Sequence, residues 1–282
     1  MSEVSALICL LDDPDSFVNE AVRNRLYELR ETSLTEMREF VVYNNSNEIK
    51  ILVEELLFEF GFKKFKEEMM NIINNNIDND FDLEQTLLII SYIGYPDLNP
   101  NSVSQQVDTM SDIISSKLKD RKNGSKVISI INSYLFDNLG FLPVQPDQYY
   151  NPENSFINYV IENRTGLPVT LCCIYLLISE RLNLKLGGIG FPGHFMLKYN
   201  GEFNTSFYID PYNGGLLYSK EYCIKLLSDM GIESNEREEF LEPISNKLIT
   251  VRILRNLILI YQKIKPLYAK DLESIINLIS KK

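Results

Sequence analysis

The chain has 282 residues, of which 45% are hydrophobic and 24% are charged, and its formal net charge at pH 7 is −11. This length and composition are ordinary for a soluble globular protein with one large domain or two modest ones. The acidic balance argues against a general nucleic-acid or anionic-membrane binder, because such proteins hold phosphate groups with a surplus of Lys and Arg.

The N-terminal region, residues 1–95, is predicted to be all helical. Hydrophobic residues recur at helical spacing from Val4 and again from Phe17, and the acidic, proline-containing turn 12–15 separates the two runs. Two short helices joined in this way resemble one unit of a HEAT-type hairpin. Further helices are predicted over 48–73 and 82–92, with a polar loop over 74–80 between them.

The central region, residues 96–235, carries both helical and strand-like patterns. Helices are predicted over 102–119, 124–138, 155–162 and 170–182, and from Ser219 to Gly231. Strand-like runs are predicted over 186–191, 194–199 and 206–209. Asn200-Gly201 is a strong turn dipeptide between the last two runs, so a hairpin is expected there.

The C-terminal region, residues 236–282, is predicted to be helical. An apolar stripe from Ile249 to Tyr261 indicates the first helix, and Lys265-Pro266 interrupts the pattern before a last helix. The region therefore has room for one helical hairpin.

The N-terminal residues and the cysteines indicate a cytoplasmic protein. An acid, Glu3, stands where a signal peptide has positive charge, and the longest apolar runs fall short of the roughly 18 residues of a membrane span. The four cysteines have no metal-ligand spacing, and the chain has one histidine. We therefore expect no metal, no cofactor, no membrane and no nucleic acid as partners.

That histidine, His194, is predicted to pair with Asp210 across the hairpin. If the two strands pair antiparallel, Asp210 lies opposite His194 or one residue away, within reach of a hydrogen bond. A carboxylate in this place orients the imidazole of a Cys–His–Asp or Ser–His–Asp site. A two-residue turn at Asn200-Gly201 would instead put Phe207 opposite His194. A histidine that only hydrogen-bonds its neighbour in a hairpin is the other interpretation.

A nucleophile for this pair is expected at the start of helix 170–182, because a helix N-terminus lowers the pKa of a thiol and its N–H groups can hold an oxyanion. The helix begins with neither cysteine nor serine. Thr170 is the hydroxyl nearest its start, and we predict that it is the N-cap. Cys172 lies one turn deeper, four residues after Pro168 and on the same face, where a thiol is usually a small core residue.

Four runs of the central region carry a family pattern. They are Tyr149-Tyr150-Asn151-Pro152-Glu153-Asn154-Ser155-Phe156, Arg164-Thr165-Gly166-Leu167-Pro168-Val169-Thr170-Leu171, Gly188-Ile189-Gly190-Phe191-Pro192-Gly193-His194-Phe195 and Ile209-Asp210-Pro211-Tyr212-Asn213-Gly214-Gly215. In this order and at these separations they resemble the SirB-type branch of the transglutaminase-like superfamily. The match continues weakly downstream through Arg255-Asn256-Leu257, and it covers most of the chain from about residue 82 onward.

The resemblance implies a papain-like α+β core in which helix 170–182 packs on an antiparallel sheet. Active members of the superfamily have a Cys, His, Asp triad, and His194 and Asp210 match its last two members. The nucleophile position falls on about Pro168, and the SirB-type branch itself typically lacks the cysteine. The branch often carries tetratricopeptide-like helices at its C-terminus, and residues 245–282 look like a shortened version of them.

These features favour a non-catalytic transglutaminase-like domain that binds a peptide or protein partner through a remnant His–Asp cleft. Pro168, Gly193 and Asn213 are predicted to line that cleft. The alternative is a hydrolase or acyltransferase that uses the His–Asp pair with Cys172 or Thr170 as its nucleophile. A purely structural scaffold differs from the first interpretation only in whether the cleft is occupied. An inactive transglutaminase is favoured over an active one, because a proline stands near the nucleophile position.

Overall fold

The protein is described by a computed structural model that covers residues 2–43, 47–118, 123–201 and 206–280. The chain folds into two compact units. The first consists of Met1–Asn71 and Ile89–Asn99, and the second of Ile72–Leu88 and Pro100–Lys282. The three-part division expected from the sequence, with boundaries at residues 95 and 235, stays a prediction.

The first unit is built from helices. They are α1 (Glu3–Ile8), α2 (Ser16–Glu28), α3 (Arg30–Tyr43) and most of α4 (Asn47–Asn75). Asp15 caps α2 by accepting a hydrogen bond from the Phe17 backbone N–H at 2.9 Å, so the acidic turn ends where the helix begins. Apolar side chains of these helices pack into one cluster that includes Leu26 and Met37, both fully buried.

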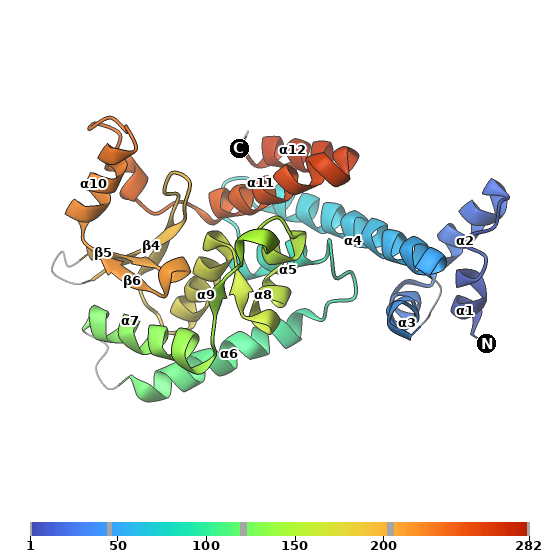
Figure 1. Ribbon diagram of the computed structural model, residues 1–282, viewed down its shortest axis with the longest axis horizontal. Helices are drawn as coiled ribbons and strands as arrows, with labels where there is room; N and C mark the ends of the chain where they lie inside the picture. Colours follow the sequence, from blue (N-terminus) through green and yellow to red (C-terminus); the bar gives the residue numbers. More distant parts are fainter. Residues whose placement is uncertain (1, 44–46, 119–122, 202–205, 281–282) are drawn as a thin grey trace. The chain divides into compact units, whose positions relative to one another are not determined.

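The second unit holds most of the described helices (Figure 1). They are α6 (Pro100–Lys117), α7 (Gly124–Asn132), α8 (Ile157–Asn163), α9 (Pro168–Arg181), α10 (Lys220–Asp229), α11 (Asn246–Ile264) and α12 (Pro266–Ser280). In sequence, α5 (Leu83–Ser91) crosses the boundary between the units. A π-helical turn, Ser133–Asn138, continues α7, so the predicted helix 124–138 consists of two helix types.

The second unit also contains an antiparallel sheet with the strand order β3-β4-β5-β6. Its strands are β3 (Leu186–Ile189), β4 (Met196–Asn200), β5 (Ser206–Asp210) and β6 (Leu216–Tyr218). Two very short parallel strands, β1 (Leu142–Pro143) and β2 (Thr165–Gly166), pair between α7 and α9, where no strand was predicted. The expected α+β class, with a helix on an antiparallel sheet and helical ends, is confirmed.

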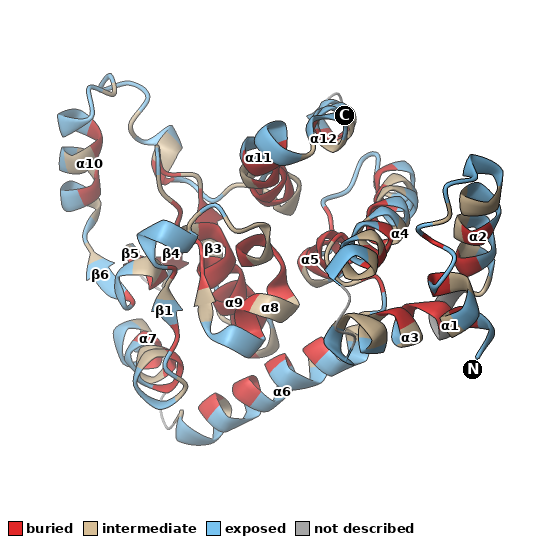
Figure 2. Cartoon of the chain, turned by 45° about the vertical axis from the view of Figure 1, so that its right-hand side comes forward, coloured by how far each residue is buried: buried red, intermediate tan, exposed pale blue. Residues whose placement is uncertain are grey.

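Helix α9 forms the centre of the second unit. Every residue from Val169 to Ser179 is buried, and Figure 2 shows the helix almost entirely in the colour of buried residues. It contacts α6, α8 and α11 and the strands β3 and β4. A helix that is packed on several sides needs apolar residues around its whole circumference, and the sequence of α9 supplies them. The hairpin that follows α9 therefore rests on a rigid core helix.

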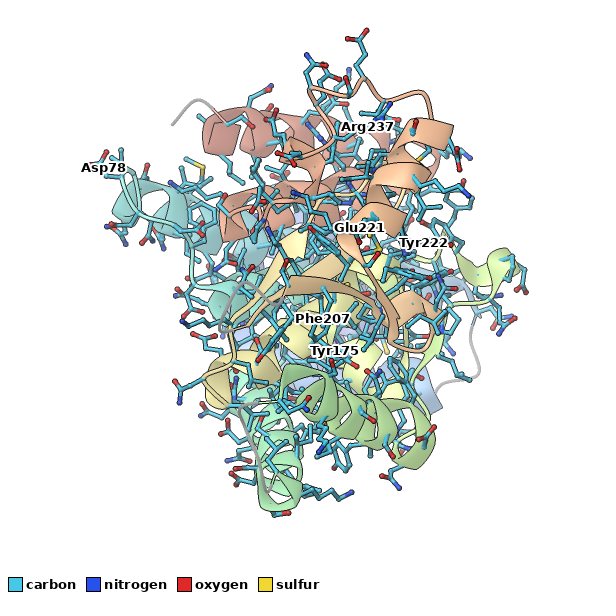
Figure 3. All side chains as sticks on the ribbon, turned by 90° about the vertical axis from the view of Figure 1, so that its left-hand side faces the viewer. Asp78, Tyr175, Phe207, Glu221, Tyr222 and Arg237 are labelled. Atoms are coloured by element: carbon cyan, nitrogen blue, oxygen red, sulfur yellow. The ribbon has the colours of Figure 1, made fainter. Side chains whose placement is uncertain are left out.

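Helix α10 packs on the sheet through its apolar side chains. Cys223 and Leu227 of α10 are fully buried in a cluster with Met196 of β4. At the edge of this contact Tyr222 stacks on Tyr218 of β6, with the ring centroids 4.9 Å apart, and Figure 3 shows Tyr222 on α10. The sheet is thus held between α9 and α10.

Gly188 in β3 lies where a larger residue does not fit. An added Cβ would lie 2.8 Å from Phe195 Cζ and 3.2 Å from Ile249 Cδ1, and both side chains are buried. We expect Gly188→Ala to lower the free energy of unfolding by about 1–3 kcal/mol, because the added methyl group overpacks the core.

Gly190→Ala is the matched control for this substitution. Its Cβ would meet Ile244 Cδ1 at 3.7 Å, which is an ordinary van der Waals contact. Urea denaturation followed by circular dichroism measures both variants. Equal losses of stability in the two variants would contradict the steric explanation.

Candidate functional site

The β4–β5 hairpin has a register that differs from the predicted one. Leu197 pairs with Ile209, and Tyr199 pairs with Phe207. The prediction that strand pairing itself places His194 opposite Asp210 is therefore wrong, because His194 precedes β4 by two residues. The alternative register, with Phe207 opposite His194, is wrong as well.

A tight turn brings His194 to Asp210 in spite of this register. The His194 backbone N–H donates to the Phe191 carbonyl oxygen at 3.0 Å, and Gly193 has a φ of +67°. Proline followed by a glycine of positive φ is the pattern of a type II turn. The turn directs the imidazole toward the end of β5, where His194 Nε2 lies 2.9 Å from Asp210 Oδ2.

Asp210 is held at the end of β5 by hydrogen bonds. Its side chain is 3% exposed, and Asn213 contacts it twice, through Nδ2 to Oδ2 at 2.7 Å and through the backbone N–H to Oδ1 at 3.3 Å. Burial acts to raise the pKa of Asp210, but the hydrogen bonds and charge of His194, together with the bonds from Asn213, lower it below its ordinary value. The arrangement therefore keeps a carboxylate beside the imidazole.

The turn after Asp210 is anchored to α7 and α9. Asn132 Nδ2 donates to the Gly215 carbonyl oxygen at 2.8 Å, and the Tyr175 hydroxyl donates to Asn132 Oδ1. Gly215 has a φ of +76°, and a Cβ at this position would overlap the Asn132 amide. The glycine is required there both by its conformation and by the close approach of Asn132.

His194 is also contacted by groups from two further elements. Its side chain is 23% exposed, and the Tyr212 ring packs edge-on against it with the centroids 5.9 Å apart. Arg252 of α11 donates from Nη2 to the His194 carbonyl oxygen at 2.5 Å and to the Phe191 carbonyl oxygen at 3.3 Å. Sequence reasoning did not single out Arg252. The nearest signal was the Arg255-Asn256-Leu257 run, one helical turn away.

Thr170 has a structural contact that differs from the predicted one. Helix α9 begins at Pro168, and Leu167 occupies the N-cap position, so the prediction that Thr170 is the N-cap is wrong. Thr170 Oγ1 instead accepts a hydrogen bond from the Leu167 backbone N–H at 2.9 Å and lies 3.1 Å from the Asn154 carbonyl oxygen. The hydroxyl is fully buried.

Cys172 lies in the core beneath the turn. Its Sγ is 3.5 Å from the Phe195 carbonyl oxygen, and the residue is fully buried. Burial, and to a lesser extent the charges of Cys173 and Asp210, raise the pKa of the Cys172 thiol well above its ordinary value. Within the described ranges, neither Cys172 nor Thr170 hydrogen-bonds His194.

Thiol labelling tests the burial of the cysteines. Cys9 is exposed, whereas Cys172, Cys173 and Cys223 are buried. We expect Ellman's reagent to modify one thiol quickly in the native protein and all four cysteines after unfolding in guanidinium chloride. The Cys9→Ser variant should lose the fast reaction. A second fast thiol that disappears in Cys172→Ala would show that Cys172 is accessible and reactive.

The residues predicted to line a cleft lie in different surroundings. Pro168 is half-buried at the first position of α9, and Gly193 is exposed at the turn. Asn213 is also exposed, but its polar atoms bind Asp210. A cavity of about 430 Å³ lies elsewhere in the second unit, between α6, α8 and the segment after α7, and its lining includes Arg164 and none of these three residues.

In the part of the chain that the structure describes, no group of three or more His, Cys, Asp or Glu side chains is placed to hold a metal ion. In the same part of the chain, none of the helices is both long and apolar enough to span a bilayer.

Comparison of the sequence with known proteins identifies a family. Residues 101–255 match the family described as the transglutaminase-like superfamily. A UPF0162 protein of Xylella fastidiosa strain Temecula1 is 32% identical over 203 residues, which cover 69% of this chain and 72% of the relative. A UPF0162 protein of Vibrio cholerae is 29% identical over 108 residues, which cover 38% of this chain and 40% of the relative.

A more distant similarity reaches a mammalian protein. Mouse F-box only protein 21 is 34% identical over 85 residues, which cover 30% of this chain and 13% of that protein. No solved structure matches the chain. The match over residues 101–255 spans the turn that carries His194, the strand that ends at Asp210 and the helix that supplies Arg252. The chain thus belongs to the transglutaminase-like superfamily and is a relative of the UPF0162 proteins.

Proposed function

We propose that the chain is a non-catalytic domain of the SirB-type branch and that it binds a peptide or protein partner beside His194 and Asp210. The observation that carries this proposal is the contrast between the pair and its candidate nucleophiles. His194 is fixed by Asp210 and partly exposed, whereas Cys172 and Thr170 are buried and hydrogen-bonded to backbone carbonyls. The pair can therefore donate a hydrogen bond to a ligand or accept one from it, although no nucleophile lies beside the imidazole.

The start of α9 supports the same proposal. Helix N-termini favour thiolates and oxyanions, and this one begins with Pro168, whose side chain has no nucleophilic atom. A proline at this position is favourable for the helix, because its fixed φ suits the first turn and its missing N–H leaves no bond unmade. The chain would thus keep the fold of the site without the chemistry of acyl transfer.

The enzyme alternative rests on the position of Cys172. Its Sγ contacts the carbonyl of Phe195, the residue after His194. A nucleophilic thiol must be ionised and reach its substrate, yet burial raises the pKa of Cys172 and hides its sulfur. A hydrolase or acyltransferase that uses Cys172 or Thr170 would therefore need α9 and the turn to separate.

We also propose that the helices at the two ends of the chain contribute contact surface. The HEAT-like helices before residue 95 and the tetratricopeptide-like hairpin formed by α11 and α12 would extend the surface offered to a partner, as helical hairpins commonly do. We also propose that the protein acts in the cytoplasm.

Selection of short random peptides displayed on phage against the intact protein tests the proposal. A selected peptide is then synthesised with a fluorophore, and its affinity is measured by fluorescence anisotropy. We expect His194→Gln to weaken binding by about tenfold or more, which corresponds to about 1.4 kcal/mol. Lys185→Gln, an exposed change directly before β3, should leave the affinity unchanged.

Two results would count against the proposal. One is that no selected peptide depends on His194 for its affinity, although His194→Gln has the circular dichroism spectrum of the wild type. The other is cleavage or acylation of the peptide by the wild type that is lost in Cys172→Ala or Thr170→Val, which would favour the enzyme alternative.

A further inference from the structure

Arg252 of α11 is a partly buried cation directly behind the turn of His194. Its Nη2 donates two hydrogen bonds to the turn, to the carbonyl oxygens of Phe191 and His194. Its guanidinium also lies over the Phe195 ring, 5.6 Å from the centroid. Among the described residues, Nε and Nη1 have no hydrogen-bond acceptor. The side chain is thus fixed in place with donors to spare.

No carboxylate of the described residues neutralises this cation. Four other arginines, Arg23, Arg25, Arg38 and Arg181, each form an ion pair with Asp or Glu. Within the described ranges neither Arg252 nor Arg255 forms one, and Arg164 and Arg237 likewise contact backbone carbonyl oxygens instead. This absence is notable because acids outnumber bases in the chain, which carries a net charge of −11.

Arg255 adds a second positive charge next to the first. It is exposed on α11, one helical turn after Arg252. Burial lowers the pKa of Arg252, and the charge of Arg255 lowers it further, whereas Tyr149 acts in the opposite direction. Two like charges close to each other on one helix repel, and an anion bound between them would remove that repulsion.

Two tyrosines lie near this group of side chains. Tyr212 packs against His194, and its hydroxyl donates to the Val144 carbonyl oxygen at 3.4 Å. Tyr149 is close enough to both Tyr212 and Arg252 to influence their pKa values.

We propose that Arg252 and Arg255 form a subsite that binds a carboxylate of the peptide lying against His194. This inference rests on the proposed function and names the chemistry that the site selects. A guanidinium matches a carboxylate in shape and charge, and a cation that is already fixed loses little side-chain entropy on binding. The carboxylate comes either from the peptide's C-terminus or from an Asp or Glu side chain.

The lone histidine provides a direct measurement of this binding. Because the chain contains one histidine, the imidazole signals in a ¹H–¹⁵N NMR spectrum belong to His194. The intact protein is titrated with N-acetyl-dialanine, with its C-terminal amide, and with N-acetyl-glutamic acid α-amide. We expect saturable shifts of the His194 signals with at least one of the two carboxylates, and affinity at least about tenfold weaker for the fully amidated peptide. The better of the two carboxylates identifies the source.

Matched variants assign the effect to the arginines. Arg255→Gln removes an exposed charge and should weaken carboxylate binding by about threefold to fivefold. Arg252→Lys keeps the charge but loses the fork, and should weaken it by about tenfold or more. Lys185→Gln removes one positive charge directly before β3 and should have no effect.

The possible results separate this inference from the proposed function. Equal shifts with the acid and the amide, or equal losses in Arg255→Gln and Lys185→Gln, would overturn the carboxylate subsite while leaving peptide binding in place. No shift of the His194 signals with any of the three compounds would count against both.

Discussion

Asp210→Ala is expected to lower the free energy of unfolding by about 2–4 kcal/mol at neutral pH. The carboxylate is almost fully buried and accepts hydrogen bonds from His194 Nε2, Asn213 Nδ2 and the Asn213 backbone N–H. Alanine would leave these donors without an acceptor, and hydrogen bonds to charged groups contribute more than those between neutral ones. Urea denaturation at pH 7 measures the loss. Asp112→Ala, on an exposed position of α6, should change stability by less than about 0.5 kcal/mol.

The stability that Asp210 contributes should also depend on pH, and its lowered pKa sets the direction of that dependence. The pKa of Asp210 is lowered in the folded protein, so the unfolded state binds its proton more tightly. The stabilisation is therefore fully present above the ordinary aspartate pKa of about 3.9 and is lost as the pH falls through the lower folded value. The difference between wild type and Asp210→Ala should shrink below about pH 4. A difference that stayed constant from neutral to acidic pH would show that the charge of Asp210 contributes nothing.

Phe195→Ala is expected to have the second large effect, a loss of about 3–5 kcal/mol in the free energy of unfolding. The ring is fully buried, fills the space above Gly188 and carries the Arg252 guanidinium on its face. Removing the ring leaves a cavity, and the closely packed side chains around it cannot move far enough to fill that cavity. Circular dichroism in urea measures the change.

Phe195→Leu is the control that keeps most of the volume. It should cost less than about 2 kcal/mol, because a branched apolar side chain still fills part of the space. Similar losses for leucine and alanine would indicate that the aromatic face beneath Arg252, rather than the filled volume, stabilises this region. A loss below about 1 kcal/mol for alanine would show that the core here is loosely packed.

The helices of the second unit were predictable because their signals are local. The local pattern places α9 within two residues of its observed bounds, and the predicted stripe from Ile249 to Tyr261 lies inside α11. In the first unit α3 was missed although Leu34, Met37 and Val41 recur at helical spacing, so there the pattern was present. The two-residue strands β1 and β2 have no pattern to recognise, because they form only where the tertiary structure brings their backbones together.

The amino-acid sequence alone determined that His194 and Asp210 are near each other, since both lie at the ends of neighbouring strands and in a family pattern. It did not determine how they meet. A hairpin register depends on loop geometry that residue types leave open, and the contact here is made by the Phe191–His194 turn rather than by strand pairing.

Only the tertiary structure brought Arg252 to the site. It follows His194 by 58 residues, and its hydrogen bonds to the turn form because α11 packs against α9 and thereby lies beside the turn. Likewise only packing decided that Cys172 and Thr170 are buried. Which side of an apolar helix faces a site is settled by the elements around it, and α9 is covered on several sides at once.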